Sequence, residues 1–73
     1  MVKIRYCNSR GYKPRAARVA AELKQALNID ASMEVGNSGE FTVWVDDRQV
    51  AEKKWGRFPD PAAVVAAVKA AQS

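Results

Sequence analysis

Apolar and polar residues alternate in three short segments of the chain, and this alternation predicts three β-strands. The segments cover residues 2–6, 31–35 and 41–45. Because successive side chains of a strand point to opposite faces, the apolar set of each segment is expected to face a core. A weaker fourth strand is predicted over residues 49–54, where lysines and an acid suit the edge of a sheet.

Two other segments repeat their apolar residues at helical spacing and predict two α-helices. The first covers residues 14–27, and Asn28 can end it because asparagine tolerates a left-handed backbone. The second covers residues 61–71. Its start is marked by Asp60, which suits the capping position, and by Pro61, which suits the first helical position.

The order of these elements, β-α-β-β-β-α, restricts how the strands can pair. The first two strands are joined by a helix, so they should be parallel with a right-handed crossover. The last two are joined by the turn Asp46–Asp47, so they should be antiparallel. The expected fold is of the α/β (α+β) class: a thioredoxin-like sandwich of a mixed four-stranded sheet and two helices, forming a single domain over residues 1–73.

Composition narrows the class of protein. A chain of 73 residues has room for one small core. With one cysteine and no histidine, an internal disulfide is excluded and a structural zinc site is not expected. A free thiol suits a reducing compartment, and neither a signal peptide nor an apolar span of ~20 residues is visible. These features predict a cytoplasmic monomer with no membrane segment.

Charge is distributed unevenly along the chain. The net charge is +4, and residues 1–18 carry six basic residues and no acid. Such a stretch can attract a small acidic ligand, an acidic protein or nucleic acid, or it can be a solvated basic face. Nucleic acid is the least favoured partner, because only Tyr6 and Tyr12 interrupt the basic stretch and stacking platforms need exposed aromatic rings.

The only cysteine, Cys7, lies where the first strand ends and a helix is about to begin. Nearby cations and a helix start both favour a thiolate, so its pKa is expected below the ~8.5 of a free thiol. The alternative is a small hydrophobic residue with an inert sulfur. The side chain of Arg10 could hold the thiolate or bind a carboxylate, or it could be an ordinary exposed arginine.

Several aromatic residues have two interpretations as well. Tyr12 and Trp55 could flank a substrate groove, but Trp44 and Trp55 are more simply packing residues of a small core. Trp55 and Phe58 are expected to act as the aromatic anchors of the loop before the last helix, and Phe58 to pin that loop to the protein.

Three motifs, in the same order and at similar spacing, give the chain a resemblance to the selenoprotein W-like family, also called SelT/SelW/SelH or Rdx proteins. The resemblance covers nearly the whole chain. The motifs are Tyr6-Cys7 with Gly11-Tyr12-Lys13-Pro14-Arg15-Ala16, then Gly39-Glu40-Phe41-Thr42-Val43, then Lys53-Lys54 with Gly56-Arg57-Phe58-Pro59-Asp60.

The resemblance implies a thioredoxin-like fold with a Cys-x-x-Cys or Cys-x-x-selenocysteine site, and redox chemistry linked to glutathione or to thiols of partner proteins. Cys7 matches the first position of that site, and Arg10 occupies the second. An internal two-thiol cycle is therefore excluded. No cofactor is expected, with glutathione as a possible co-substrate. The candidate catalytic residue is Cys7, and the candidate ligand-binding loop comprises Asn8, Ser9, Arg10, Gly11, Tyr12 and Lys13.

Two functions from different classes follow. The first is a monothiol redox protein in cell redox homeostasis, in which Cys7 forms a mixed disulfide with glutathione or a partner protein and an outside thiol resolves it. The second is a redox-inactive interaction module that binds an acidic partner through the basic first half. Because the second thiol of the motif is missing, the sequence does not decide whether the protein has thiol-disulfide oxidoreductase activity. A measured Cys7 pKa discriminates between the two.

Overall fold

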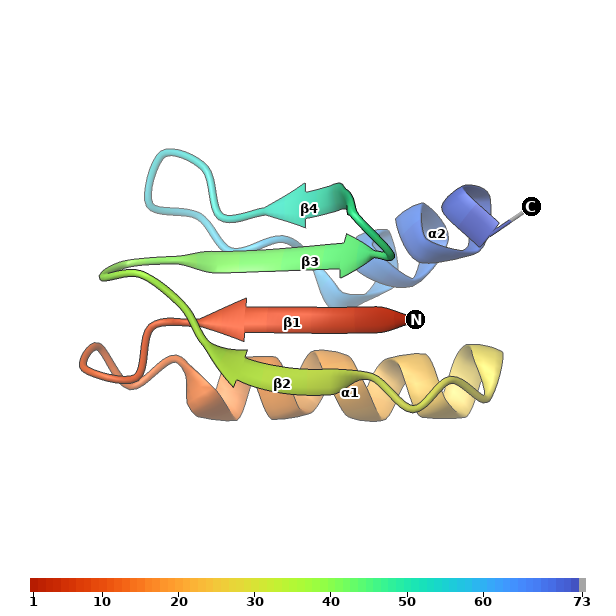
Figure 1. The fold of residues 1–73 in the computed structure, drawn as a ribbon, viewed down its shortest axis with the longest axis horizontal. Coiled ribbons are helices and arrows are strands. Elements are labelled where there is room, and N and C mark those ends of the chain that lie inside the picture. Colours follow the sequence, from red (N-terminus) through yellow and green to blue (C-terminus); the bar gives the residue numbers. More distant parts are fainter. Residues whose placement is uncertain (73) are drawn as a thin grey trace.

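The computed structural model describes residues 1–72, and their element order is the predicted β-α-β-β-β-α (Figure 1). Each strand and helix lies within a few residues of its predicted position. The elements are β1 (Val2–Tyr6), α1 (Lys13–Leu27), β2 (Ser32–Val35), β3 (Phe41–Val45), β4 (Arg48–Glu52) and α2 (Pro61–Gln72).

The four strands form one mixed sheet in the order β2-β1-β3-β4. β1 pairs in parallel with β2 and antiparallel with β3, so Ile4 lies between Met33 and Val43. β4 pairs antiparallel with β3 through the two-residue turn after Val45, where Asp46 has a φ of 54°. The predicted parallel pair and the predicted hairpin are both confirmed, and β2 and β4 form the edges of the sheet.

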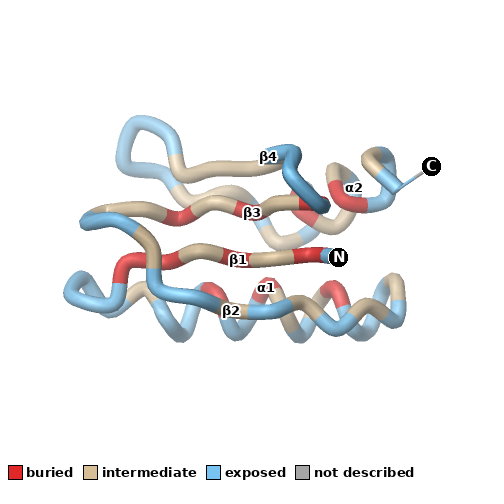
Figure 2. Tube along the Cα trace, viewed as in Figure 1, coloured by how far each residue is buried: buried red, intermediate tan, exposed pale blue. Residues whose placement is uncertain are grey.

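Both helices cover the same face of the sheet (Figure 1). Buried positions run along β1 and β3 and along the inner sides of the helices, as Figure 2 shows. Burying one aliphatic or aromatic side chain contributes about 1.5–3 kcal/mol. Neither helix is long and apolar enough to cross a membrane. The core consists of Val2, Ile4, Tyr6, Ala16, Val19, Leu23, Phe41, Val43, Val45, Val64 and Val68.

The helix ends follow the predicted residues closely. α1 begins one residue before Pro14, which therefore lies in the first turn, where its missing N–H has no role. Asn28 ends the helix in the left-handed conformation, with φ of 56°, and its N–H bonds to the carbonyl of Lys24 at 3.0 Å. At α2, Asp60 Oδ1 accepts a hydrogen bond from the N–H of Ala62 at 3.0 Å, which confirms the predicted cap.

The segment after β4 differs from the prediction. The strand ends at Glu52 instead of residue 54, because the chain turns back on itself and Lys54 pairs with Arg57 in an isolated bridge. Trp55, at the tip of this turn, has a left-handed backbone and is 97% exposed. The prediction that Trp55 packs in the core or anchors this loop is therefore wrong.

Trp44 also lies outside the core. The residues of β3 alternate, so Phe41, Val43 and Val45 are buried under the helices and Trp44 is on the face that the helices leave open. Its indole N–H donates to the hydroxyl of Thr42 at 2.9 Å. The ring is half-buried, and its packing on this face replaces the core position that was predicted.

Candidate functional site

Three loops lie at the same end of the sheet, as Figure 1 shows. They follow β1, β2 and β4, and cover residues 7–12, 36–40 and 53–60. β1 and β2 are parallel, so their carboxyl ends lie at the same edge. This arrangement brings together the loop that holds Cys7 and two loops that are distant from it in sequence.

The loop after β1 is a tight turn. The N–H of Gly11 bonds to the carbonyl of Asn8 at 3.1 Å, and the N–H of Tyr12 bonds to the carbonyl of Cys7 at 3.2 Å. Gly11 has a φ of 72°, a conformation that glycine adopts without a steric penalty. The turn leaves Asn8, Gly11 and the two residues between them exposed, whereas Cys7 is buried.

The thiol of Cys7 lies among hydrogen-bond donors. Its Sγ is 3.3 Å from the hydroxyl oxygen of Ser9. That contact and backbone hydrogen bonds from Gly39, Arg10 and Ser9 lower the pKa of Cys7 to about 7, although burial opposes the shift. Donors of this kind favour the thiolate because they stabilise its charge. The expected lowering of the Cys7 pKa is present.

The cause of this shift differs from the predicted one. Arg10 lowers the Cys7 pKa through its backbone N–H, and the charges of Arg10 and Lys13 are not among the causes. The side chain of Arg10 is exposed and extends toward the loop after β2, where a Cβ on Gly39 would lie 3.7 Å from its Nε. Lys13 is exposed at the first position of α1.

Cys7 is covered in this structure, with 2% of its surface exposed. The neighbouring residues Asn8, Ser9 and Arg10 are all exposed. A reagent or partner that attacks the sulfur therefore requires a displacement of the residues that cover it. This burial agrees with the interpretation of Cys7 as a small hydrophobic residue with an inert sulfur. The hydrogen bonds to its thiol agree with the interpretation of Cys7 as a reactive thiol.

The loop after β2 is fixed by Glu40. Its carboxylate accepts hydrogen bonds from the N–H of Asn37 at 2.8 Å and from the hydroxyl of Thr42 at 2.6 Å. Arg5 Nε lies 3.6 Å from the same group. Burial raises the pKa of Glu40, but these bonds and the basic side chains of β1 outweigh it, and the pKa falls below 4.5. Glu40 therefore holds the turn in which Gly39 reaches the thiol.

The sequence indicates no role for Gly39 or Glu40 beyond their place in a motif. A partial signal was present, because an Asn-Ser-Gly turn followed by a single acid precedes the third strand. The contact to Cys7 could not be read from the sequence, since it depends on β1 and β2 ending side by side.

The third loop packs through Phe58 and not through Trp55. The ring of Tyr12 meets Phe58 edge-on, with centroids 4.7 Å apart, and Phe58 meets Phe41 in the same way at 5.3 Å. Lys53 Nζ donates to the hydroxyl of Tyr12 at 3.1 Å. The prediction that Phe58 pins this loop is confirmed. Tyr12 and Trp55 do not form a shared groove, because Trp55 is almost fully exposed.

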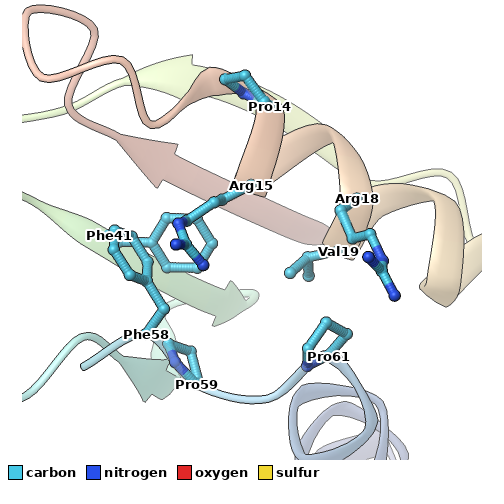
Figure 3. A pocket seen from close by; sticks show the side chains of 8 residues that line it. All are labelled: Pro14, Arg15, Arg18, Val19, Phe41, Phe58, Pro59 and Pro61. Atoms are coloured by element: carbon cyan, nitrogen blue, oxygen red, sulfur yellow. The ribbon is translucent and has the colours of Figure 1, made fainter.

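A pocket of about 300 Å³ lies between α1 and the segment that leads into α2 (Figure 3). It is close to the Cys7 loop in the fold, but the thiol does not line it. Within residues 1–72, no three His, Cys, Asp or Glu side chains gather as metal ligands would. The pocket is lined by Pro14, Arg15, Arg18, Val19, Phe41, Phe58, Pro59 and Pro61.

Comparison with solved structures finds the same fold. A selenoprotein W-related protein from Vibrio cholerae superposes with a TM-score of 0.83 at 21% identity, covering 99% of this chain and 95% of that one. A protein from Bordetella parapertussis gives a TM-score of 0.81 at 23% identity, covering 96% and 94% of the two chains. At this identity the likeness establishes the fold alone. No curated protein sequence matches the chain.

The sequence itself decides the family. The model of the Rdx family matches residues 1–70, which include β1, the Cys7 loop and nearly all of α2. Over this length the match confirms the resemblance carried by the three motifs, and the chain belongs to the Rdx family.

Proposed function

We propose that this protein is a thiol-redox protein that acts through the single thiol of Cys7. Membership of the Rdx family supports a redox-related function of the thioredoxin-like kind. The observation that carries the proposal is the arrangement around the sulfur: a hydroxyl at 3.3 Å and backbone donors from two loops, which lower its pKa to about 7.

The proposed step is an exchange between a thiolate and a disulfide. The Cys7 thiolate attacks one sulfur of oxidised glutathione, a new sulfur–sulfur bond forms, and the original one breaks to release glutathione thiolate. A second thiol, from glutathione or a partner protein, then attacks the mixed disulfide and regenerates Cys7. The outside thiol is required because the chain holds no other cysteine.

The loop suits this chemistry in two ways. A pKa of about 7 leaves roughly half of Cys7 as thiolate at neutral pH, near the optimum for an attacking thiol. The exposed guanidinium of Arg10 can bind a carboxylate of glutathione through two parallel hydrogen bonds. In this proposal Asn8 and Ser9 form the surface that the tripeptide meets, and Gly11 to Lys13 fix the turn. The protein acts as a monomer in the cytoplasm, where a lone thiol stays reduced.

The direct test is adduct formation with oxidised glutathione at pH 7, followed by mass spectrometry of the intact protein. The folded protein is expected to gain one glutathione, which a reducing agent removes. A Cys7→Ser variant serves as the control and should gain none. Failure of the folded protein to react, while the same chain reacts in urea, contradicts the proposal because the sulfur is then accessible only after unfolding.

A second function, a redox-inactive interaction module, is favoured by two observations. Cys7 is 2% exposed, and Trp55 is 97% exposed on a turn that also carries Lys54 and Arg57. Exposed tryptophan and arginine are the residues that protein interfaces use most strongly. The glutathione experiment separates the two functions, because the module requires no accessible thiol.

A further inference from the structure

The pocket beside α1 has the size of a binding site for one or two side chains. Ligand pockets in proteins span ~300–1,000 Å³, and this one, at about 300 Å³, is at the small end. Its walls come from two parts of the fold: Arg15 and Arg18 from α1, and Pro59 and Pro61 from the segment opposite (Figure 3). It is open to solvent between them.

The base of the pocket is apolar and its rim is cationic. Val19 and Phe41 are core residues, and Phe58 is half-buried between them and the surface. The guanidinium carbon of Arg15 lies 4.0 Å from the centroid of the Phe58 ring. Stacking of this kind holds the guanidinium plane in place and leaves its N–H edge available to an acceptor.

No acid among the lining residues neutralises this rim. Two acids adjoin the lining residues: Asp60 lies between Pro59 and Pro61 in the chain, and Glu22 contacts Arg18. Asp60 caps α2 through the N–H of Ala62. Glu22 is 3.9 Å from Arg18, whose side chain is 72% exposed, so this pair is weak. Arg15 has no ion pair within residues 1–72, and the pocket therefore presents uncompensated positive charge beside an apolar surface.

The pocket is also adjacent to the thiol loop. Phe58, which lines the pocket, packs edge-on against Tyr12 with centroids 4.7 Å apart. The N–H of Tyr12 bonds to the carbonyl of Cys7. The wall of the pocket therefore packs directly on the loop that carries the sulfur, and a peptide bound in the pocket lies beside that loop.

We propose that this pocket binds a partner protein through a short segment in which an apolar side chain is flanked by Asp or Glu. The apolar side chain packs on Phe58 and Val19, and the flanking carboxylates pair with Arg15 and Arg18. Charge complementarity selects this occupant, since a neutral or basic segment leaves the two guanidinium groups unpaired. The inference rests on the proposed function in one respect: the bound segment is taken to belong to the partner protein whose thiol reacts with Cys7. Binding of the segment itself needs no thiol.

The test is a titration followed by NMR of the ¹⁵N-labelled protein, with three blocked tripeptides as probes. Acetyl-Glu-Phe-Glu-amide is expected to shift the amide signals around the pocket. A peptide with glutamine in place of both glutamates tests the charge, and one with alanine in place of phenylalanine tests the apolar contact. The peptide without glutamates loses two charge-assisted contacts and is expected to bind about a hundredfold more weakly than the first peptide. The peptide without phenylalanine loses one buried ring and is expected to bind about tenfold more weakly.

Substitutions on the protein locate the binding. Arg15→Glu and Arg18→Glu are expected to raise the dissociation constant of the first peptide about tenfold each. Arg48→Glu is the matched control, because it makes the same charge change at the far end of the sheet and should leave binding unchanged. Arg15→Lys keeps the charge without the planar stacking and should fall between the native protein and Arg15→Glu. Unchanged dispersion of the other NMR signals shows that each variant is folded.

Two results overturn the inference. One is equal binding of the charged and neutral peptides; the other is an equal loss on Arg15→Glu and Arg48→Glu, which would indicate general attraction to a basic protein. Repeating the titration with Cys7→Ser separates this inference from the proposed function. Peptide binding is expected to persist in that variant, whereas glutathione adduct formation is abolished. If the native protein binds the peptide but forms no glutathione adduct, the result contradicts only the redox proposal.

Discussion

The hydroxyl oxygen of Ser9 lies 3.3 Å from the Sγ of Cys7, within the turn that follows β1. This short-range contact is the first of the causes that lower the pKa of Cys7, ahead of the backbone hydrogen bond from Gly39. The thiolate is therefore stabilised chiefly by dipoles fixed by the fold and not by the surrounding basic charge. Salt, which screens exposed charges, is expected to have little influence on it.

Replacing Ser9 should show this directly. Ser9→Ala removes the hydroxyl and is expected to raise the pKa of Cys7 toward its usual value. Arg10→Ala is the matched comparison, because alanine keeps the backbone N–H through which Arg10 acts, and its effect should be smaller. The pKa of each variant is measured from thiolate absorbance against pH. A larger shift for Arg10→Ala would show that side-chain charge controls the thiol.

A second thiol can be introduced at the position that Arg10 occupies. The N–H of Gly11 donates a hydrogen bond to the carbonyl of Asn8, and the N–H of Tyr12 donates one to the carbonyl of Cys7, so the loop is tightly folded. An internal disulfide requires Cα atoms within about 7 Å of one another. We expect Arg10→Cys to form such a bond in a glutathione redox buffer, as detected by the loss of two alkylatable thiols. If the variant only accumulates glutathione adducts, the loop lacks the geometry of a two-cysteine site.

The cap of α2 can be tested by stability. Asp60 accepts a hydrogen bond from the N–H of Ala62, so Asp60→Ala should cost about 1 kcal/mol of the free energy of unfolding. Asp60→Asn keeps an acceptor of similar capping strength and should leave stability nearly unchanged. Urea titration measures both variants. An equal loss of stability in both variants would show that the negative charge of Asp60, and not its capping hydrogen bond, stabilises the helix.

Glu40 should make the fold sensitive to acid. Its pKa is lowered below 4.5 in the folded protein, so the folded state binds the proton less readily than the unfolded chain. The stability that its charge contributes is therefore complete above about pH 4.5 and is lost as pH falls through the lowered pKa. The native protein should be more stable than Glu40→Gln at pH 7, with the difference shrinking in acid. A difference that does not change with pH would contradict this.

The strands and helices could be predicted because their signals are local. The alternation in β1 and β3, the left-handed Asn28 and the Asp60–Pro61 start of α2 each depend on neighbouring residues alone. The pairing of β1 with β2 followed from the crossover rule and not from any particular contact.

The details of the site could not be predicted in the same way. Gly39 reaches the thiol of Cys7 from a loop 32 positions later, and the pocket forms only where Arg15 of α1 meets Phe58. The two tryptophans are expected as packing residues of a small core, but the helices cover only one face of the sheet, and Trp55 is at the tip of a turn. For Trp44 the signal is local, because the alternation over residues 41–45 places it opposite Phe41, Val43 and Val45. For Trp55 no local pattern indicates its exposure.

The central claim is that Cys7 is a reactive thiol in the folded protein. It is tested most directly by the rate of alkylation with iodoacetamide as a function of pH, measured on the folded protein and on the chain unfolded in urea. The account predicts that the folded protein reacts, with a midpoint near pH 7, and that the unfolded chain has a midpoint near the ~8.5 of a free thiol. A folded protein that does not react, or that shows the midpoint of the unfolded chain, would contradict it.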